Sequence, residues 1–183
     1  MLTLPASTTW RGLSTDAPLP LLLCISEKVP NLLLPPQSSI SYCRTSHEAL
    51  QAIHDHYMQS HFVGGMGESD PGVWFIGSYD PEVIEETKLE RHGVPFGLFT
   101  NGLDPEVPTE LDVLQVSLYA GSPSDYAKVT GGSASDFGRI CGFIAQASEQ
   151  GVAVEAGVLK EFVGKGARDL ALSLGAQDVH IYE

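Results

Sequence analysis

Basic residues are scarce in this sequence of 183 residues, which holds 10 Lys and Arg against 23 Asp and Glu. The formal net charge at pH 7 is therefore −13. Such an excess of negative charge repels phosphate backbones and anionic lipid headgroups. The composition argues against nucleic acid and membrane surfaces as partners, and it leaves a small-molecule ligand as the expectation.

Long apolar runs are absent as well. A membrane-spanning helix needs about 20 consecutive apolar residues, and the longest apolar stretch here, residues 19–25, is far shorter. This stretch suits a buried strand instead. We therefore expect no association with a membrane.

Cysteine is nearly absent, with only Cys24, Cys43 and Cys141. An odd number of widely spaced cysteines does not fit a disulfide framework, and free thiols are typical of a reducing compartment. We therefore expect a cytoplasmic protein. Residues 1–18 are rich in Ser and Thr and contain one Arg, which predicts a flexible leader and only weakly resembles an organelle transit peptide.

Apolar strands alternate with amphipathic helices along the chain, which predicts an α/β fold with a parallel sheet. With 43% hydrophobic residues, residues 19–183 are expected to form a single domain with its own core. Residues 27–46 are expected to form a long loop. Six strands are expected, at residues 19–26, 73–77, 96–99, 113–118, 152–159 and 178–182.

Two of these strands end in small polar residues. Residues 96–99 are followed by Thr100, Asn101 and Gly102, and Ser117 lies near the end of residues 113–118. Because the carboxyl ends of parallel strands meet at one edge of a sheet, these residues are expected to face a common site.

These strand ends resemble those of the radical S-adenosylmethionine (radical SAM) superfamily, whose fold is a partial (β/α)6 TIM-like barrel. The resemblance lies in Thr100-Asn101-Gly102 and in Val116-Ser117-Leu118, followed in the same order by residues 122–158 and 168–183. It implies the same partial barrel and a binding site for S-adenosyl-L-methionine.

In that superfamily a glycine–acid motif binds the amino group of the cofactor. Gly67-Glu68 matches the motif better by residue type, whereas Gly77-Ser78, followed by Asp80, comes directly after an apolar strand and leads into a helix. We favour the second because its context is the expected one. A turn with a helix cap would give the same pattern without any ligand.

The resemblance also implies that Ser117 contacts the carboxylate or ribose of the cofactor, with Asn101 beside it and His180 or Tyr182 near the adenine. Simpler interpretations stay open. Asn-Gly is a common turn dipeptide, and His180 could be a packed residue of the core.

The superfamily's CxxxCxxC motif, which ligates a [4Fe–4S] iron–sulfur cluster through soft thiolates, is incomplete. Tyr42-Cys43 resembles its end, but the two partner positions are Pro36 and Ile40, which cannot ligate iron. Cys43 is therefore the one metal ligand that the resemblance implies, and a bound cluster is doubtful.

Three functions stay open. The first is a divergent, non-catalytic member that binds S-adenosyl-L-methionine or a related nucleoside. The second is an active radical SAM enzyme whose cluster ligands are missing from this version of the chain. The third is a barrel lyase that uses Lys160 to form a Schiff base, although a lysine beside Glu161 is more often part of an ordinary ion pair.

Overall fold

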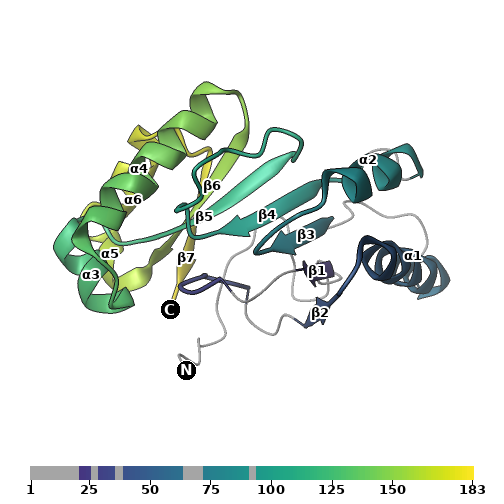
Figure 1. Cartoon of the computed structure of the whole chain (residues 1–183). Coiled ribbons are helices and arrows are strands. Elements are labelled where there is room, and N and C mark those ends of the chain that lie inside the picture. The colour runs from purple at the N-terminus through teal and green to yellow at the C-terminus, as the bar shows by residue number, and fades with distance from the viewer. Residues whose placement is uncertain (1–20, 26–28, 36–38, 64–71, 91–93) are drawn as a thin grey trace.

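Seven parallel strands form one open sheet in the order β2-β1-β3-β4-β5-β6-β7 (Figure 1). The computed structural model describes residues 21–25, 29–35, 39–63, 72–90 and 94–183. The strands are β1 (Leu21–Cys24), β2 (Ile40–Tyr42), β3 (Val73–Ile76), β4 (Phe96–Thr100), β5 (Val113–Tyr119), β6 (Ala153–Leu159) and β7 (Asp178–Tyr182). The predicted α/β class and parallel sheet are confirmed, and β2 and β7 form the two edges of the sheet.

Local sequence explains where the helices begin. The helices are α1 (Ser46–Val63), α2 (Pro81–Glu90), α3 (Pro123–Thr130), α4 (Ala134–Glu149), α5 (Lys160–Val163) and α6 (Ala167–Ser173). Ser122 caps α3 by accepting from the Asp125 N–H. Ser133 caps α4, and the Asp136 carboxylate accepts from the Ser133 N–H in return. Such reciprocal bonds satisfy backbone donors that the first turn of a helix leaves unpaired.

The described residues form seven strands, one more than the six that were predicted. The additional strand, β2, lies inside the stretch that was expected to be a loop. It has three residues, none of them buried, so no apolar run marks it in the sequence. The predicted alternation of strand and helix also fails between β4 and β5, because residues 101–112 link these two strands without a helix. The predicted leader, residues 1–18, lies outside the described residues.

One face of the sheet is covered by helices. Each of the six helices contributes buried side chains to a single apolar cluster, together with alternate residues of the strands such as Phe75, Leu98 and Val116. In Figure 1, α1 and α2 lie beside β1 to β4, while α3 to α6 gather beside β5 to β7. Because side chains alternate along a strand, the residues between these point to the opposite face.

The opposite face changes in character from β1 to β7. Near β1, β3 and β4 it is apolar, with Leu22, Trp74 and Phe99 in a second cluster. Near β5 to β7 it is polar. The polar residues there are Gln115, Ser117, Glu155, Asp178, His180 and Tyr182, which alternate with the helix-facing residues in the strand register.

Residues 29–35, which we call the strap, cross this opposite face. Leu32 and Leu34 pack against the second cluster, and the Leu33 N–H donates to Ser117 Oγ over 2.9 Å. Gly157 makes room for the strap, since a Cβ there would lie 3.1 Å from Leu33 Cδ1. The strap therefore brings an early part of the chain onto the central strands.

None of the helices in the described part of the chain is both long and apolar enough to cross a bilayer.

Candidate ligand-binding site

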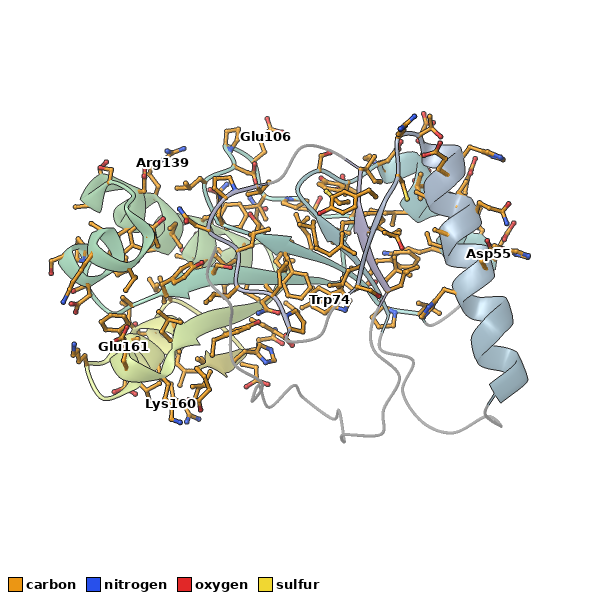
Figure 2. The ribbon with its side chains drawn as sticks, turned by 90° about the horizontal axis from the view of Figure 1, so that it is seen from below. Asp55, Trp74, Glu106, Arg139, Lys160 and Glu161 are labelled. Carbon is orange, nitrogen blue, oxygen red and sulfur yellow. The ribbon has the colours of Figure 1, made fainter. Side chains whose placement is uncertain are left out.

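A cavity of about 730 Å³ lies at the carboxyl ends of β5, β6 and β7. This is the edge of a parallel sheet at which α/β proteins usually bind ligands. Figure 2 shows two of its residues, Lys160 and Glu161, at the opposite end of the molecule from Asp55 of α1. The lining residues are Asn31, Leu32, Leu33, Tyr119, Val129, Leu159, Lys160, Glu161 and Glu183.

Two residues of this lining have unusual backbone conformations. Asn31 has φ 55° and Tyr119 has φ 67°, and among the described residues they are the only ones other than glycine with positive φ. Asparagine tolerates this region because its short side chain can bond locally, whereas tyrosine does not. Strained residues concentrate at ligand sites, where the surrounding structure holds them in place.

The strain at Tyr119 has a local cause. The Ala120 N–H donates to the Leu118 carbonyl over 2.8 Å, which closes a γ-turn centred on Tyr119. A γ-turn with positive φ is rare. The pairing of β5 with β6 also shifts between Ser117 and Tyr119, and such irregularities turn a side chain in a new direction. Together they direct Tyr119 to the cavity.

The Tyr119 hydroxyl is kept protonated. Burial raises the pKa of Tyr119 to about 12, with a smaller contribution from Tyr126. The two tyrosine rings meet edge to face with centroids 6.3 Å apart, which fixes the position of Tyr119 against α3. Tyr119, which lines the cavity, therefore stays neutral to a higher pH than an ordinary tyrosine.

Charged residues of both signs lie at the rim of the cavity. Lys160 begins α5 directly after β6, and its Nζ forms an ion pair with Glu183 rather than with Glu161. The Lys160 side chain is 64% exposed. The cavity therefore offers one ammonium group and two carboxylates beside apolar walls.

The motif predicted at the end of β3 is a helix cap in this structure. Asp80 Oδ1 accepts from the Glu82 N–H over 3.0 Å, and its second oxygen accepts from Ser46 Oγ. The Ser46 bond is the main reason that the pKa of Asp80 lies below its usual range. Gly77 has φ 91° and forms the turn before the helix, beside the exposed Ser78. The alternative motif, Gly67-Glu68, lies outside the described residues.

Asn101 and Ser117 are brought together by the strap. Ser117 Oγ accepts from Leu33, while Asn101 Nδ2 donates to the Pro30 carbonyl over 3.3 Å. Asn101 Oδ1 accepts from the Leu103 N–H over 3.1 Å. These two predicted site residues therefore hold the strap in place and are largely buried.

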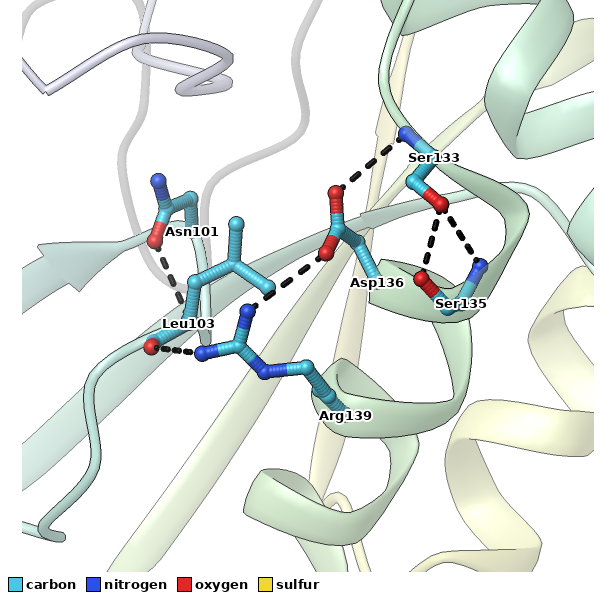
Figure 3. Close-up of polar contacts among 6 residues, drawn as sticks. All are labelled: Asn101, Leu103, Ser133, Ser135, Asp136 and Arg139. Atoms are coloured by element: carbon cyan, nitrogen blue, oxygen red, sulfur yellow. Dashed lines mark hydrogen bonds and ion pairs between the residues drawn. The ribbon is translucent and has the colours of Figure 1, made fainter.

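The loop after β4 is also tied to a helix. Figure 3 shows the Leu103 carbonyl accepting from Arg139 Nη2 over 2.9 Å, next to the capped start of α4. Arg139 Nη1 lies 3.5 Å from Asp136 Oδ1. The position of Asn101 is therefore fixed from both sides, by the strap and by α4.

His180 lies on the polar part of the sheet face and not in the lining of the cavity. It shares a row with Ser117, since both pair with Gly157 in the strand register. Its Nε2 lies 2.7 Å from Glu155 Oε2, and its side chain is 2% exposed. Tyr182, on the same strand, accepts from Gln115 Nε2 through its hydroxyl.

The three cysteines do not converge on one place. The Cys43 N–H donates to the Cys24 carbonyl over 2.9 Å at the ends of β1 and β2. Cys141 lies on α4, which packs on β5 and β6, so β3 and β4 separate it from the other two. Burial, with help from Glu48 and Cys24, raises the pKa of Cys43. A thiol held protonated is a poor iron ligand.

Several residues of the cavity carry no signal in the sequence. Tyr119 and Asn31 stand out only through their backbone angles, which no residue pattern reveals. Glu183 becomes part of the site through the ion pair with Lys160. Among these residues, only Lys160 could be singled out from the sequence, because it directly follows a predicted strand.

No family model matches the sequence, and no curated protein matches it. The resemblance to the radical SAM superfamily therefore rests on the sequence segments described above and stays a prediction.

Proposed function

We propose that this chain binds a small cationic or zwitterionic nucleoside of the S-adenosyl-L-methionine class. The site is the cavity at the carboxyl ends of β5 to β7, on a sheet wound as a partial (β/α)6 TIM-like barrel. The cavity itself is the observation that carries the proposal. Its volume of about 730 Å³ falls in the usual range for small-molecule sites, about 300–1,000 Å³.

The winding of the sheet supports the barrel part of the proposal. Strands β3 to β7 follow one another in sequence order, and all six helices contribute to the cluster on one face. Barrels of alternating strands and helices are wound in this way, with ligands bound at the carboxyl ends of the strands.

The chemistry of the lining matches such a ligand. Leu32 and Leu159 offer apolar walls for a purine ring. Glu161 and Glu183 offer carboxylates for an ammonium or sulfonium group, and Lys160 can pair with a ligand carboxylate. In the free protein Lys160 and Glu183 pair with each other. A zwitterionic ligand would replace this ion pair with two others, one between Lys160 and the ligand carboxylate and one between Glu183 and the ligand ammonium group.

The residues favour binding over the two catalytic alternatives. A Schiff-base lysine is activated by an apolar pocket or a cationic neighbour, whereas Lys160 is 64% exposed and paired with a carboxylate. A [4Fe–4S] cluster needs several converging thiolates. Cys24 and Cys43 adjoin, but Cys141 lies on a distant helix, so the three cysteines do not fit a cluster.

Calorimetry with S-adenosyl-L-methionine, S-adenosylhomocysteine and adenosine tests the proposal. We expect S-adenosyl-L-methionine to bind more tightly than S-adenosylhomocysteine, which lacks the sulfonium charge. Glu161→Gln should weaken the binding of S-adenosyl-L-methionine by about tenfold, as expected for loss of one charge-assisted contact. Lys160→Met should weaken the binding of S-adenosyl-L-methionine and S-adenosylhomocysteine, which carry an amino-acid group, but leave the affinity for adenosine unchanged.

Glu149→Gln is the matched control, because it removes the same charge from an exposed position at the end of α4. It should leave all affinities unchanged. Absence of binding by all three ligands at millimolar concentration would refute the proposal. Equal weakening by the control would show that only overall charge attracts the ligand.

A further inference from the structure

Three side chains that can ligate a metal converge on the polar part of the sheet face. One ligand atom each of Glu155, Asp178 and His180 lies within 4.8 Å of the others. Glu155 comes from β6 and the other two from β7. They lie on rigid neighbouring strands, on the face that the helices do not cover.

The two carboxylates are placed directly against each other. Glu155 pairs with Asp178 in the register of β6 and β7, so their side chains leave the same face side by side. Like charges at opposite positions of neighbouring strands are destabilising. The Glu155 side chain is only 15% exposed, so water screens this repulsion poorly. A bound cation would remove it.

A buried acceptor without a partner adjoins the same place. Gln115 is fully buried, and its Oε1 is the one buried side-chain oxygen or nitrogen in the described residues that lacks a hydrogen bond. Gln115 lies opposite Glu155 in the pairing of β5 with β6. Its amide nitrogen donates to the Tyr182 hydroxyl, which holds the side chain over the polar face. An amide oxygen without a donor is suited to a metal ion or to water bound to one.

From these observations we propose that Glu155, Asp178 and His180 bind a divalent first-row transition metal, with the Gln115 amide beside it. His180 Nε2 and Glu155 Oε2 lie 2.7 Å apart, and two ligand atoms of a tetrahedral ion are about 3.3 Å apart, so a small rotation of either side chain would admit the ion. One imidazole with carboxylates favours Zn²⁺ or Co²⁺ over Mg²⁺, which prefers oxygen ligands alone. This site is separate from the nucleoside cavity, and neither proposal depends on the other.

A simpler arrangement makes a different prediction. A protonated His180 could bridge the two carboxylates as a purely structural ion pair. In that case added metal would find no ordered site, and the ions would bind weakly at several places on the acidic surface. The two accounts therefore differ in stoichiometry and in the choice of ion.

Titration of the chelator-treated full chain with Co²⁺, Zn²⁺ and Mg²⁺ separates them. We expect one Co²⁺ per chain, with visible d–d absorption that Zn²⁺ abolishes, and no competition from Mg²⁺ at equal concentration. Glu155→Gln, Asp178→Asn and His180→Gln should each lower the Co²⁺ affinity by at least tenfold, and circular dichroism should check that each variant folds.

Two control variants match these changes at exposed positions. Glu149→Gln and His54→Gln lie on α4 and α1, away from the three side chains, and should bind Co²⁺ as the wild type does. The wild-type titration decides the question even if a site variant fails to fold. Binding of several ions per chain, equal binding of Mg²⁺, or no binding at all would overturn the proposal.

Discussion

Gly97 lies beneath the ring of Trp74, and this contact predicts a large effect of a single methyl group. The two residues pair across β3 and β4. A Cβ at position 97 would lie 2.4 Å from Cε3 and 2.6 Å from Cζ3 of the Trp74 ring. Carbon atoms in contact are normally about 3.5–4.0 Å apart. In Gly97→Ala the ring must therefore retreat by about 1 Å or change rotamer.

Trp74 has little room to move. It is 5% exposed, and its ring lies against Phe99 with centroids 4.8 Å apart. Inserting a methyl group into a packed core typically costs about 1–3 kcal/mol, and complete loss of a buried Trp side chain costs about 3–5 kcal/mol. We expect Gly97→Ala to lower the free energy of unfolding by about 3 kcal/mol, because an indole cannot yield like a flexible side chain.

Thermal unfolding followed by circular dichroism measures this effect. For a chain of this size, 1 kcal/mol corresponds to about 2–4 °C in Tm, so Gly97→Ala should lower Tm by about 6–12 °C. Gly138→Ala is the matched control. Gly138 is an exposed residue inside α4, and a Cβ there would meet no atom within 4 Å. The same substitution should raise stability there by about 0.5–1 kcal/mol, because Ala is the better helix former.

A double variant tests the cause. Trp74→Phe replaces the indole that packs on Gly97 with a smaller ring. In the double variant it should therefore recover part of the stability lost in Gly97→Ala, so the effects of the two changes on the unfolding free energy should not be additive. Additive effects would mean that the methyl group clashes elsewhere. A Gly97→Ala protein with an unchanged Tm would refute the packing of Trp74 on this glycine.

Two further predictions concern the strap and the cavity. Ser117→Ala leaves the buried Leu33 N–H without its acceptor and should lower the free energy of unfolding in urea by about 1–3 kcal/mol. Ser173→Ala, at an exposed site of α6, should change this free energy little. Equal effects of the two variants would contradict the role of the hydrogen bond. The raised pKa of Tyr119, about 12, means that the unfolded chain loses this proton first, near pH 10. The stability that burial of the neutral tyrosine contributes is thus present below pH 10 and is lost as the pH rises toward 12. Over this range, Tyr119→Phe should reduce the slope of the unfolding free energy against pH by up to about 1.4 kcal/mol per pH unit. An unchanged slope would show that Tyr119 titrates normally.

The sequence predicts the central strands well because each is a short apolar run that stops at polar or turn-forming residues. β3, β4 and β5 appear where expected. The strand that was not predicted lacks such contrast. β2 has three residues with no buried side chain.

The candidate site was predictable only in part. The sequence indicates the correct edge of the sheet, since strand ends gather there in any parallel fold. It cannot reveal that residues 31–33 line the same cavity as Tyr119, because their position depends on how the strap crosses the sheet. Part of the cluster of Glu155, Asp178 and His180 is visible in the sequence, because Asp178 and His180 alternate with apolar residues along one strand. Their partner Glu155 is assigned only by the strand register.

The strap also has a consequence for the order in which this chain folds. The hydrogen bond between Leu33 and Ser117 joins residues 84 positions apart, and the entropy cost of closing a loop grows with its length. During synthesis the strap emerges well before β5 exists to receive it. Until β5 has been synthesised, the leucines of the strap lack their final packing partners. Exposed apolar segments of this kind promote aggregation of incompletely folded chains. We therefore expect docking of the strap to be a late step of folding, and we expect aggregation to compete with folding mainly before this step.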